Sequence, residues 1–409
     1  MRKVLLLASF LVVVAVIQAQ FPKKLLDKAK EKVDKKVDDA TRGKEGNNNN
    51  NNTEDKDTEG APATNAGQPA SFKVYSKYDF VPGEKVIGFE DFSTGSIGDF
   101  PAGWNSNASA EIVTIEGKPG RWLWFTKAGF LTPEFPAPFP EDFTFEFDLM
   151  HGIPINGGGF TICVAELSNT NQPQNYVMST NQFTIEMNTA NTGTTTGGTR
   201  FYGRKNSSTD IQNSSDAPML NDKNNPVHIS IWRQKERVRV YVNEQKLWDI
   251  PKATIREAKF NAIVFNVNYA EEVVKHYIGN LRLAVGAPDT RKKIMEQNKW
   301  VTHGILFDVN SDKIKPESYG TLKEMANVLK EFPELKVKIV GHTDADGNDA
   351  SNLDLSKRRA AAVKESLAKD FEITESRMET DGKGESEPID KNDNPAGKAN
   401  NRRVEFIKL

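Results

Sequence analysis

VGHTDADG, residues 340–347, is followed closely by NLDLSKRRA, residues 352–360. Apolar residues alternate over residues 335–339, which predicts a strand, and the Asp, Gly and Asn residues after it predict a loop. Residues 353–368 have the apolar period of a helix. The pattern therefore predicts a strand that delivers Asp344 to a loop, with a helix directly behind it.

Arg359 lies on the flank of the apolar stripe of this predicted helix, at 3.6 residues per turn. A guanidinium that loses water needs a bidentate acceptor, because an unpaired buried charge is very costly. Asp344 is one such acceptor, and the pair would then brace the loop internally. Alternatively, both side chains face one cleft and hold the ammonium and the carboxylate of an amino acid. The residues alone leave both interpretations open.

Motifs along the last quarter of the chain resemble the OmpA-like peptidoglycan-binding domain. They are GHTD at 341–344, Gly347, Asn352, LS at 355–356, RA at 359–360, Val363, Gly382, GES at 384–386, Pro388 and NRRVE at 401–405. The similarity covers about residues 299 to 409, with the motifs in the order of the family. It implies that Asp344 and Arg359 grip the diaminopimelate residue of the peptidoglycan stem peptide, which favours a ligand clamp over an internal pair.

The same resemblance implies further ligand-binding residues around the clamp. They are Thr343, Asn352, Asp308, Asn310 and Arg403. The loop at 308–311 would lie beside the clamp, while Asn352 and Arg403 would support it through hydrogen bonds and charge, although a purely structural role is an equal alternative for Asn352, Asn310 and Arg403. Such binding makes and breaks no bond, so we expect no catalytic residue and no cofactor. We expect no metal either, because the acidic run at 344–349 lacks the Gly and Glu that a calcium loop needs at its sixth and twelfth positions.

The start of the chain predicts export. A basic pair precedes an apolar run at 4–17 that is too short for a comfortable membrane span, and a small residue, Ala19, ends it. Residues 1–19 therefore predict a cleaved signal peptide, and hence a location in the periplasm or at the cell outer membrane. Residues 20–71 predict an amphipathic helix of open function and an Asn-rich disordered linker.

Residues 72–288 predict an all-β sandwich. Strand-like runs lie between turns rich in Gly, Asn and Pro, at 86–89, 121–125, 143–150, 160–167, 182–187, 227–233, 237–242, 261–268 and 277–283. DFS at 91–93, FPAGW at 100–104 and VRVYVN at 238–243 resemble the concanavalin-type jelly roll of laminin-G-like and lectin modules. An outer-membrane barrel of eight strands is the competing fold for this length, but the polar chain from 188 to 225 favours the sandwich.

The strand at 143–150 alternates Phe with Thr144, Glu146 and Asp148, which predicts one buried and one solvated face. EFDLMH at 146–151 resembles the Glu-x-Asp-x-x-Glu strand of glycan hydrolases in this fold. His151, however, stands where the second carboxylate is needed for a retaining mechanism. We therefore expect a solvated strand face or a sugar-binding surface, and no enzyme.

The composition of the chain limits the classes of partner that it can bind. The formal net charge is −2, so no global basic footprint points to nucleic acid. Cys163 is the only cysteine and sits in an apolar run, which rules out an intrachain disulfide and predicts a buried thiol. The sequence thus predicts a multi-domain envelope protein. A concanavalin-like jelly-roll sandwich is joined by a linker at 289–299 to an α+β OmpA-like domain at 300–409, which would anchor or link the cell envelope by binding peptidoglycan. The alternative is that the sandwich binds or hydrolyses glycans, or contacts envelope proteins, and the last domain is only a wall anchor.

Overall fold

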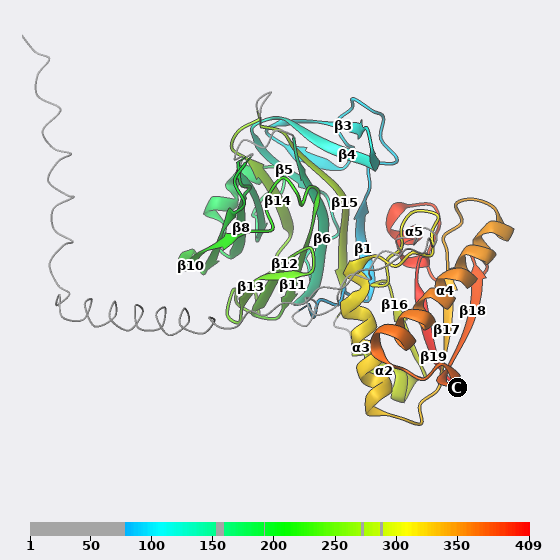
Figure 1. The fold of residues 1–409 in the computed structure, drawn as a ribbon. Helices are drawn as coiled ribbons and strands as arrows, with labels where there is room; N and C mark the ends of the chain where they lie inside the picture. Colours follow the sequence, from blue (N-terminus) through cyan, green and yellow to red (C-terminus); the bar gives the residue numbers. More distant parts are fainter. Residues whose placement is uncertain (1–77, 153–158, 192, 271–273, 287–288) are drawn as a thin grey trace, which may run out of the picture. The chain divides into compact units, whose positions relative to one another are not determined.

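The computed structural model describes residues 78–152, 159–191, 193–270, 274–286 and 289–409 (Figure 1). The predicted signal peptide at 1–19 and the predicted helix and linker at 20–71 lie outside these residues. None of the helices in the described ranges combines the length and the apolar composition needed to span a bilayer.

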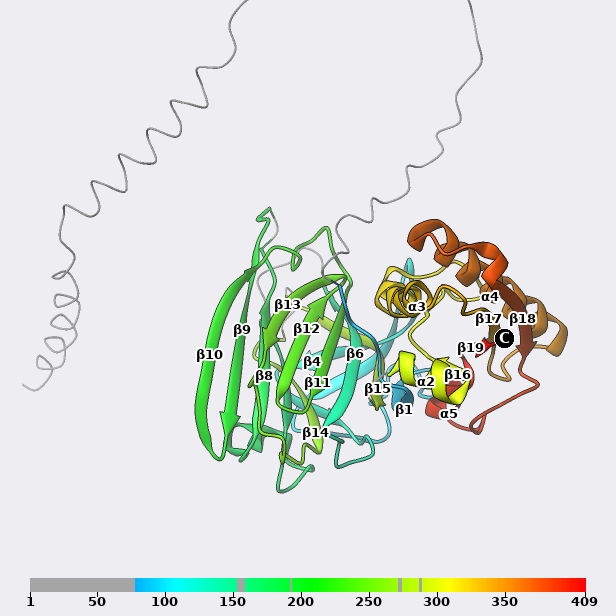
Figure 2. The same ribbon diagram turned by 90° about the horizontal axis from the view of Figure 1, so that it is seen from below.

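Two antiparallel sheets pack face to face in the part of the chain before residue 286 (Figures 1 and 2). The first has the order β13-β12-β11-β6-β15-β4-β3, with β1 also paired to β15. Its strands are β1 (Lys85–Glu90), β3 (Ser109–Ile115), β4 (Lys118–Lys127), β6 (Asp142–His151), β11 (Val227–Gln234), β12 (Arg237–Val242), β13 (Gln245–Ile250) and β15 (His276–Val285). This region is mostly β-sheet, as predicted.

The second sheet has the order β10-β9-β8-β7-β14-β5-β2. Its strands are β2 (Trp104–Ser106), β5 (Gly129–Pro133), β7 (Gly159–Ala165), β8 (Gln182–Asn188), β9 (Gly197–Lys205), β10 (Ser208–Ala217) and β14 (Ala262–Val267), and a 3₁₀ turn, η2 (Pro173–Met178), precedes β8. Of the fifteen strands that the structure describes in the two sheets, nine were predicted, and the six that were missed are β2, β3, β5, β9, β10 and β13. The hairpin of β9 and β10 was missed, because β10 is an edge strand with almost every residue exposed, so it shows no apolar alternation.

Aromatic rings fill the space between the two sheets. Phe145 and Phe147 of β6 are fully buried against Phe160 and Phe265 of the opposite sheet. Cys163 of β7 is buried in a separate apolar cluster, and burial raises the pKa of its thiol to about 12. The inward face of β6 is therefore the one that alternation predicted.

The other face of β6 was expected to be solvated, and that expectation is wrong. Thr144 and Glu146 are only 1% and 2% exposed. The chain that enters β1 covers this face: the Gly83 amide donates to the Thr144 hydroxyl (2.9 Å), and Tyr78 and Phe80 form an apolar cluster with residues of β11 and β12. Alternation tells which side chains share a face, but it does not tell what packs on that face.

Four charged groups neutralise one another on this covered face. His228 Nδ1 lies 2.7 Å from Asp148 Oδ1, and its Nε2 lies 3.4 Å from Glu146 Oε2. Arg282 Nη1 lies 3.5 Å from Glu146 Oε1. Burial favours neutral His228, but the hydrogen bonds to the two carboxylates outweigh it and raise the pKa of His228 well above its usual value. Glu146 and Asp148 are thus structural partners of His228 and Arg282.

Replacing His228 should cost stability in a pH-dependent way. The folded-state pKa of His228 lies above its unfolded value of about 6.5, so the stabilisation is fully present below that pH and is lost as the pH rises through the folded-state pKa. His228→Gln should lower the free energy of unfolding by about 3 kcal/mol at about pH 6, and by clearly less at about pH 10. Urea unfolding of both proteins at each pH measures the difference, and a pH-independent difference would contradict the charged assignment.

The C-terminal part forms a four-stranded sheet with helices. The strand order is β16-β19-β17-β18, in which β17 and β18 are parallel and the other pairs antiparallel. The elements are α2 (Thr290–Gln297), β16 (Lys299–Thr302), η3 (Pro316–Ser318), α3 (Tyr319–Glu331), β17 (Val337–His342), α4 (Asp349–Phe371), η4 (Glu375–Arg377), β18 (Met378–Gly384), α5 (Pro395–Asn401) and β19 (Val404–Lys408). Helix α4 packs over β17 and β18, so the predicted strand, loop and helix are all present.

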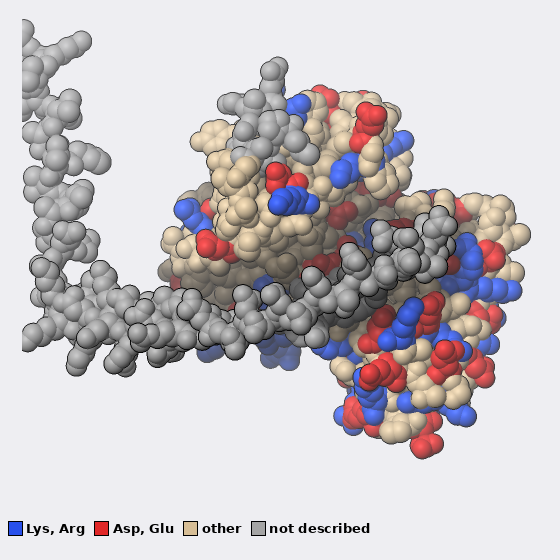
Figure 3. Space-filling model, in the orientation of Figure 1, with Lys and Arg blue, Asp and Glu red and all other residues tan. Residues whose placement is uncertain are grey.

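Two local features of this domain differ from the sequence-based expectation. Residues 289–299, expected to be a linker, contain α2, whose Ile294 is fully buried in the core of the domain. Helix α4 begins before residue 353, because the Asn348 side chain caps it by accepting from the Ser351 amide (2.9 Å). On the face seen in Figure 3, acidic and basic side chains lie interspersed over this domain instead of being gathered by sign.

Candidate ligand-binding site

Asp344 lies at the mouth of the loop after β17, with its side chain only 10% exposed. Its Oδ1 accepts from the backbone amide of Asp346 (3.2 Å), which turns the loop back on itself. Its Oδ2 forms a close ion pair with Arg402. The carboxylate is therefore held in one orientation by a backbone amide and a guanidinium.

Arg359 approaches the same region from α4. Its Nε donates to the backbone carbonyl of Ser311 (2.9 Å), and its guanidinium lies over the ring of Phe307, 4.8 Å from the ring centre. Burial and the neighbouring charge of Arg402 lower the pKa of Arg359. In the described residues Arg359 makes no ion pair with Asp344, so its Nη atoms keep their donors for another acceptor.

Arg402 was not predicted as a site residue, whereas its neighbour Arg403 was. Arg403 is 5% exposed and is satisfied internally: it pairs with Glu405 (2.8 Å) and donates to the carbonyls of Asn401 (3.3 Å) and Glu387 (2.9 Å). Arg402, at the C-cap of α5, is the arginine that reaches Asp344. The NRRVE motif does not indicate which of its two arginines pairs with Asp344.

Asn352 holds the loop that carries Asp344. Its buried side-chain amide donates to the backbone carbonyls of Asp344 (3.3 Å) and Asp346 (3.1 Å), and also to the carboxylate of Glu385. Thr343 is buried, its amide donates to the carbonyl of Gly384 (3.0 Å), and its hydroxyl has no partner among the described residues. These contacts fix the backbone of the loop that carries Asp344.

The remaining predicted residues lie on the loop after Phe307. Asp308 accepts the Ser311 amide on its backbone carbonyl (3.1 Å) and lies 3.5 Å from the Lys313 ammonium. Asn310 is exposed in a left-handed conformation (φ 53°). This turn presents the Ser311 carbonyl to Arg359, so the loop lies beside Arg359. Among the described residues, no hydrogen bond or ion pair joins Asp308 or Asn310 to Asp344 or Arg359.

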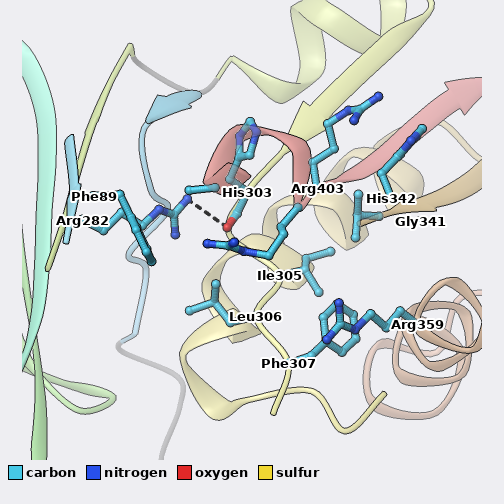
Figure 4. A pocket seen from close by; sticks show the side chains of 13 residues that line it. Phe89, Arg282, His303, Ile305, Leu306, Phe307, Gly341, His342, Arg359 and Arg403 are labelled. Carbon is cyan, nitrogen blue, oxygen red and sulfur yellow. Dashed lines mark hydrogen bonds between the residues drawn. The ribbon is translucent and has the colours of Figure 1, made fainter. Parts of the chain in front are cut away.

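A cavity of about 140 Å³ opens next to Arg359 (Figure 4). Four guanidinium groups line it, those of Arg282, Arg359, Arg402 and Arg403, together with the imidazoles of His303 and His342, and no carboxylate lines it. Burial lowers the pKa of His303 to about 4, so this imidazole is neutral at neutral pH. Arg282, Arg402 and Arg403 are paired with carboxylates outside the lining, which leaves Arg359 to take a further anionic group. Figure 4 shows Arg359 and Phe307 on one side and Phe89 and Arg282 on the other. Such a cavity suits an anionic group, and a carboxylate can accept two parallel hydrogen bonds from one guanidinium. No group of three or more metal-ligating side chains occurs in the ranges that the structure covers.

Residues 306–402 match the model of the OmpA family. Outer membrane porin F of Pseudomonas fluorescens is 45% identical over 101 residues, which are 25% of this chain and 31% of that protein. The outer-membrane lipoprotein YfiB of Pseudomonas aeruginosa is 36% identical over 103 residues, 25% of this chain and 61% of that protein. The matches thus span less than two thirds of either relative.

Among solved structures, the peptidoglycan-associated lipoprotein from Burkholderia pseudomallei is 28% identical and covers 26% of this chain and 88% of its own, with a TM-score of 0.24. The assignment of this region to the OmpA family rests on sequence similarity and not on this structural comparison. The C-terminal part of the chain is an OmpA-family domain, as expected, and its relatives carry the names of outer-membrane porins and lipoproteins. These matches do not confirm the concanavalin-like character of the preceding sandwich.

Proposed function

We propose that the C-terminal domain binds peptidoglycan without covalent chemistry, through the diaminopimelate residue of its stem peptide. The observation that carries this proposal is Arg359, a largely buried guanidinium whose Nη donors have no protein acceptor among the described residues, beside a carboxylate held in the same loop region. Arg359 takes the carboxylate of the ligand, and Asp344 takes the ammonium.

One carboxylate oxygen of Asp344 is left for the ammonium half of that zwitterion. Asp344 Oδ2 is engaged by Arg402, while Oδ1 accepts only the Asp346 amide and keeps a lone pair for an ammonium. Asn352 holds the loop. Thr343 supports the loop from its buried position, and Asp308 and Asn310 belong to the rim. Arg403 supports the site through its ion pair with Glu405.

At the level of the cell, we propose an anchor or link between the outer membrane and the wall. The names of the relatives, porin and lipoprotein of the outer membrane, support this location. The export predicted from residues 1–19, with cleavage after Ala19, and the absence of catalysis belong to the same proposal. The concanavalin-like kinship of the sandwich remains a proposal that its two antiparallel sheets support.

A carbohydrate-binding function in the sandwich is the second candidate. Trp124 of β4 and Tyr277 of β15 are half-buried neighbours whose rings stack at 6.3 Å with an angle of 27°, and the Lys275 ammonium lies 5.5 Å from the Trp124 ring. Aromatic faces with a polar rim suit the apolar faces of sugars. An envelope protein is the alternative partner for the surface around Trp124 and Tyr277.

Co-sedimentation of the full chain with purified sacculi tests the clamp. Asp344→Asn and Arg359→Gln should each weaken pelleting by about tenfold or more, because a charge-assisted hydrogen-bonded pair is lost. Free meso-diaminopimelate should compete with sacculi for the wild type. Arg358→Gln is the matched control: Arg358 is the next residue of α4, and it is exposed and paired with Asp354 and Asp312 on the surface.

Circular dichroism of each variant excludes loss of fold as the cause. If all four proteins pelleted equally, the Asp344 and Arg359 side chains would be structural. The function would then have to be sought in the sandwich, starting from Trp124 and Tyr277.

A further inference from the structure

The sandwich contributes side chains to the cavity beside the clamp. Phe89, from β1, and Arg282, from β15, line it together with Arg359 and Arg402 (Figure 4). The ring of Phe89 lies under the guanidinium of Arg402, 5.2 Å from its carbon, and Arg402 in turn pairs with Asp344. Phe89 lies outside the residues that match the OmpA family, 306–402, so this wall is a feature of the present chain.

Hydrogen bonds hold β1 against α5 and so fix Phe89 relative to the clamp. The buried side chain of Asn400 accepts from the Val86 amide (2.9 Å) and donates to the Val86 carbonyl (2.9 Å), as a neighbouring strand would. Val86 also packs with Ala284 and Ala399. In addition, Arg282 donates to the carbonyl of His303 (2.9 Å). These hydrogen bonds therefore hold Phe89 in a fixed position at the cavity.

A second cavity, of about 130 Å³, shares Phe89 and Arg402 with the first in its lining. The turn after β1 lines it with Asp91, Ser93 and Thr94, and the C-terminal domain lines it with Asp346, Asp393 and Lys398, among others. Lys398 is already paired with Asp346 (2.7 Å). This compartment thus offers carboxylates and hydroxyls, whereas the first offers guanidinium groups.

We propose that Phe89 and the turn Asp91–Thr94 bind the stem peptide directly, so that the sandwich is half of a two-domain peptidoglycan site. This inference rests on the proposed function of the clamp. The carboxylate of diaminopimelate enters the first cavity at Arg359 and its ammonium meets Asp344, while the peptide next to it crosses the face of Phe89 into the second cavity, where backbone amides meet carboxylates and hydroxyls. The site then recognises a longer piece of the peptide than an OmpA-family domain alone would.

Calorimetric titration of the full chain tests this with two ligands: meso-diaminopimelate, and the disaccharide tetrapeptide released from sacculi by a muramidase. Phe89→Ala should weaken binding of the tetrapeptide ligand about tenfold and that of diaminopimelate by less than about twofold. Thr94→Trp should do the same, since Thr94 is exposed and the indole fills the second cavity. Phe100→Ala, an exposed Phe of the following loop that lines neither cavity, is the control.

The outcomes separate the two proposals. Unchanged binding of the tetrapeptide ligand in Phe89→Ala and Thr94→Trp would overturn the two-domain site. Equal weakening of both ligands in Phe89→Ala, with Thr94→Trp unaffected, would also overturn it, because Phe89 would then act only by positioning Arg402. Undiminished binding of both ligands by Arg359→Gln would instead refute the clamp itself.

Discussion

Gly341→Ala should destabilise the C-terminal domain by about 3 kcal/mol and abolish tight binding to sacculi. Gly341 lies in β17 directly beneath α4, and a Cβ there would stand 2.3 Å from the backbone carbonyl oxygen of Ser356. Backbone cannot yield as the end of a long side chain can, so the helix must move away from the sheet. Asp344 follows β17 and Arg359 belongs to α4, so the same movement separates the two halves of the clamp.

Urea unfolding followed by tryptophan fluorescence, together with co-sedimentation, measures both effects. Gly198→Ala in β9 is the control, because a Cβ at that position meets nothing within 4 Å. The prediction fails if Gly341→Ala unfolds at the wild-type urea concentration and pellets normally. Loss of pelleting at unchanged stability would mean that α4 moves at little cost in free energy. The predicted destabilisation would then be wrong, and only the predicted separation of Asp344 from Arg359 would stand.

The strand, loop and helix that carry Asp344 and Arg359 could be predicted from sequence because their signals are local. Asp344 and Arg359 are joined by a strand end, a loop and a helix, and each of these elements has its own period or turn residues. Which arginine of the pair at 402–403 faces Asp344 was not predictable in the same way. That choice depends on where α5 ends, and Asn394 and Pro395 set the start of a helix only seven residues long.

Phe89 shows a second limit of the sequence. Its strand was predicted, but its role depends on α5, which is distant in the chain and reaches β1 through Asn400. The covered outer face of β6 has the same origin. Alternation placed Glu146 and Asp148 on one face, while their partners His228 and Arg282 come from two other strands. Contacts between elements far apart in the chain do not change the periodicity of apolar residues in either element, so the sequence of each element does not reveal them.

Arg233 of β11 is the position in the sandwich where substitution should cost most. It is fully buried, yet it pairs with no carboxylate among the described residues. Its guanidinium donates instead to five backbone carbonyls, at distances from 2.9 to 3.4 Å, which belong to Pro140, Lys235, Ile255, Arg256 and Ala258. Burial lowers its pKa to about 10, and the ring of Phe260 lies 4.7 Å from the guanidinium carbon.

Arg233→Met should therefore lower the free energy of unfolding by about 4 kcal/mol, although methionine fills much of the same volume. The loss comes from carbonyls of three separate loops that no longer share one guanidinium donor. Arg233→Lys should recover only part of it, because an ammonium cannot match the fork of the guanidinium. Arg256→Met is the matched control: its half-exposed ion pair with Glu141 (2.9 Å) should be worth no more than about 0.5 kcal/mol. Equal urea midpoints for Arg233→Met and Arg256→Met would mean that water replaces the guanidinium at these carbonyls, and that the three loops are held together by their apolar contacts alone.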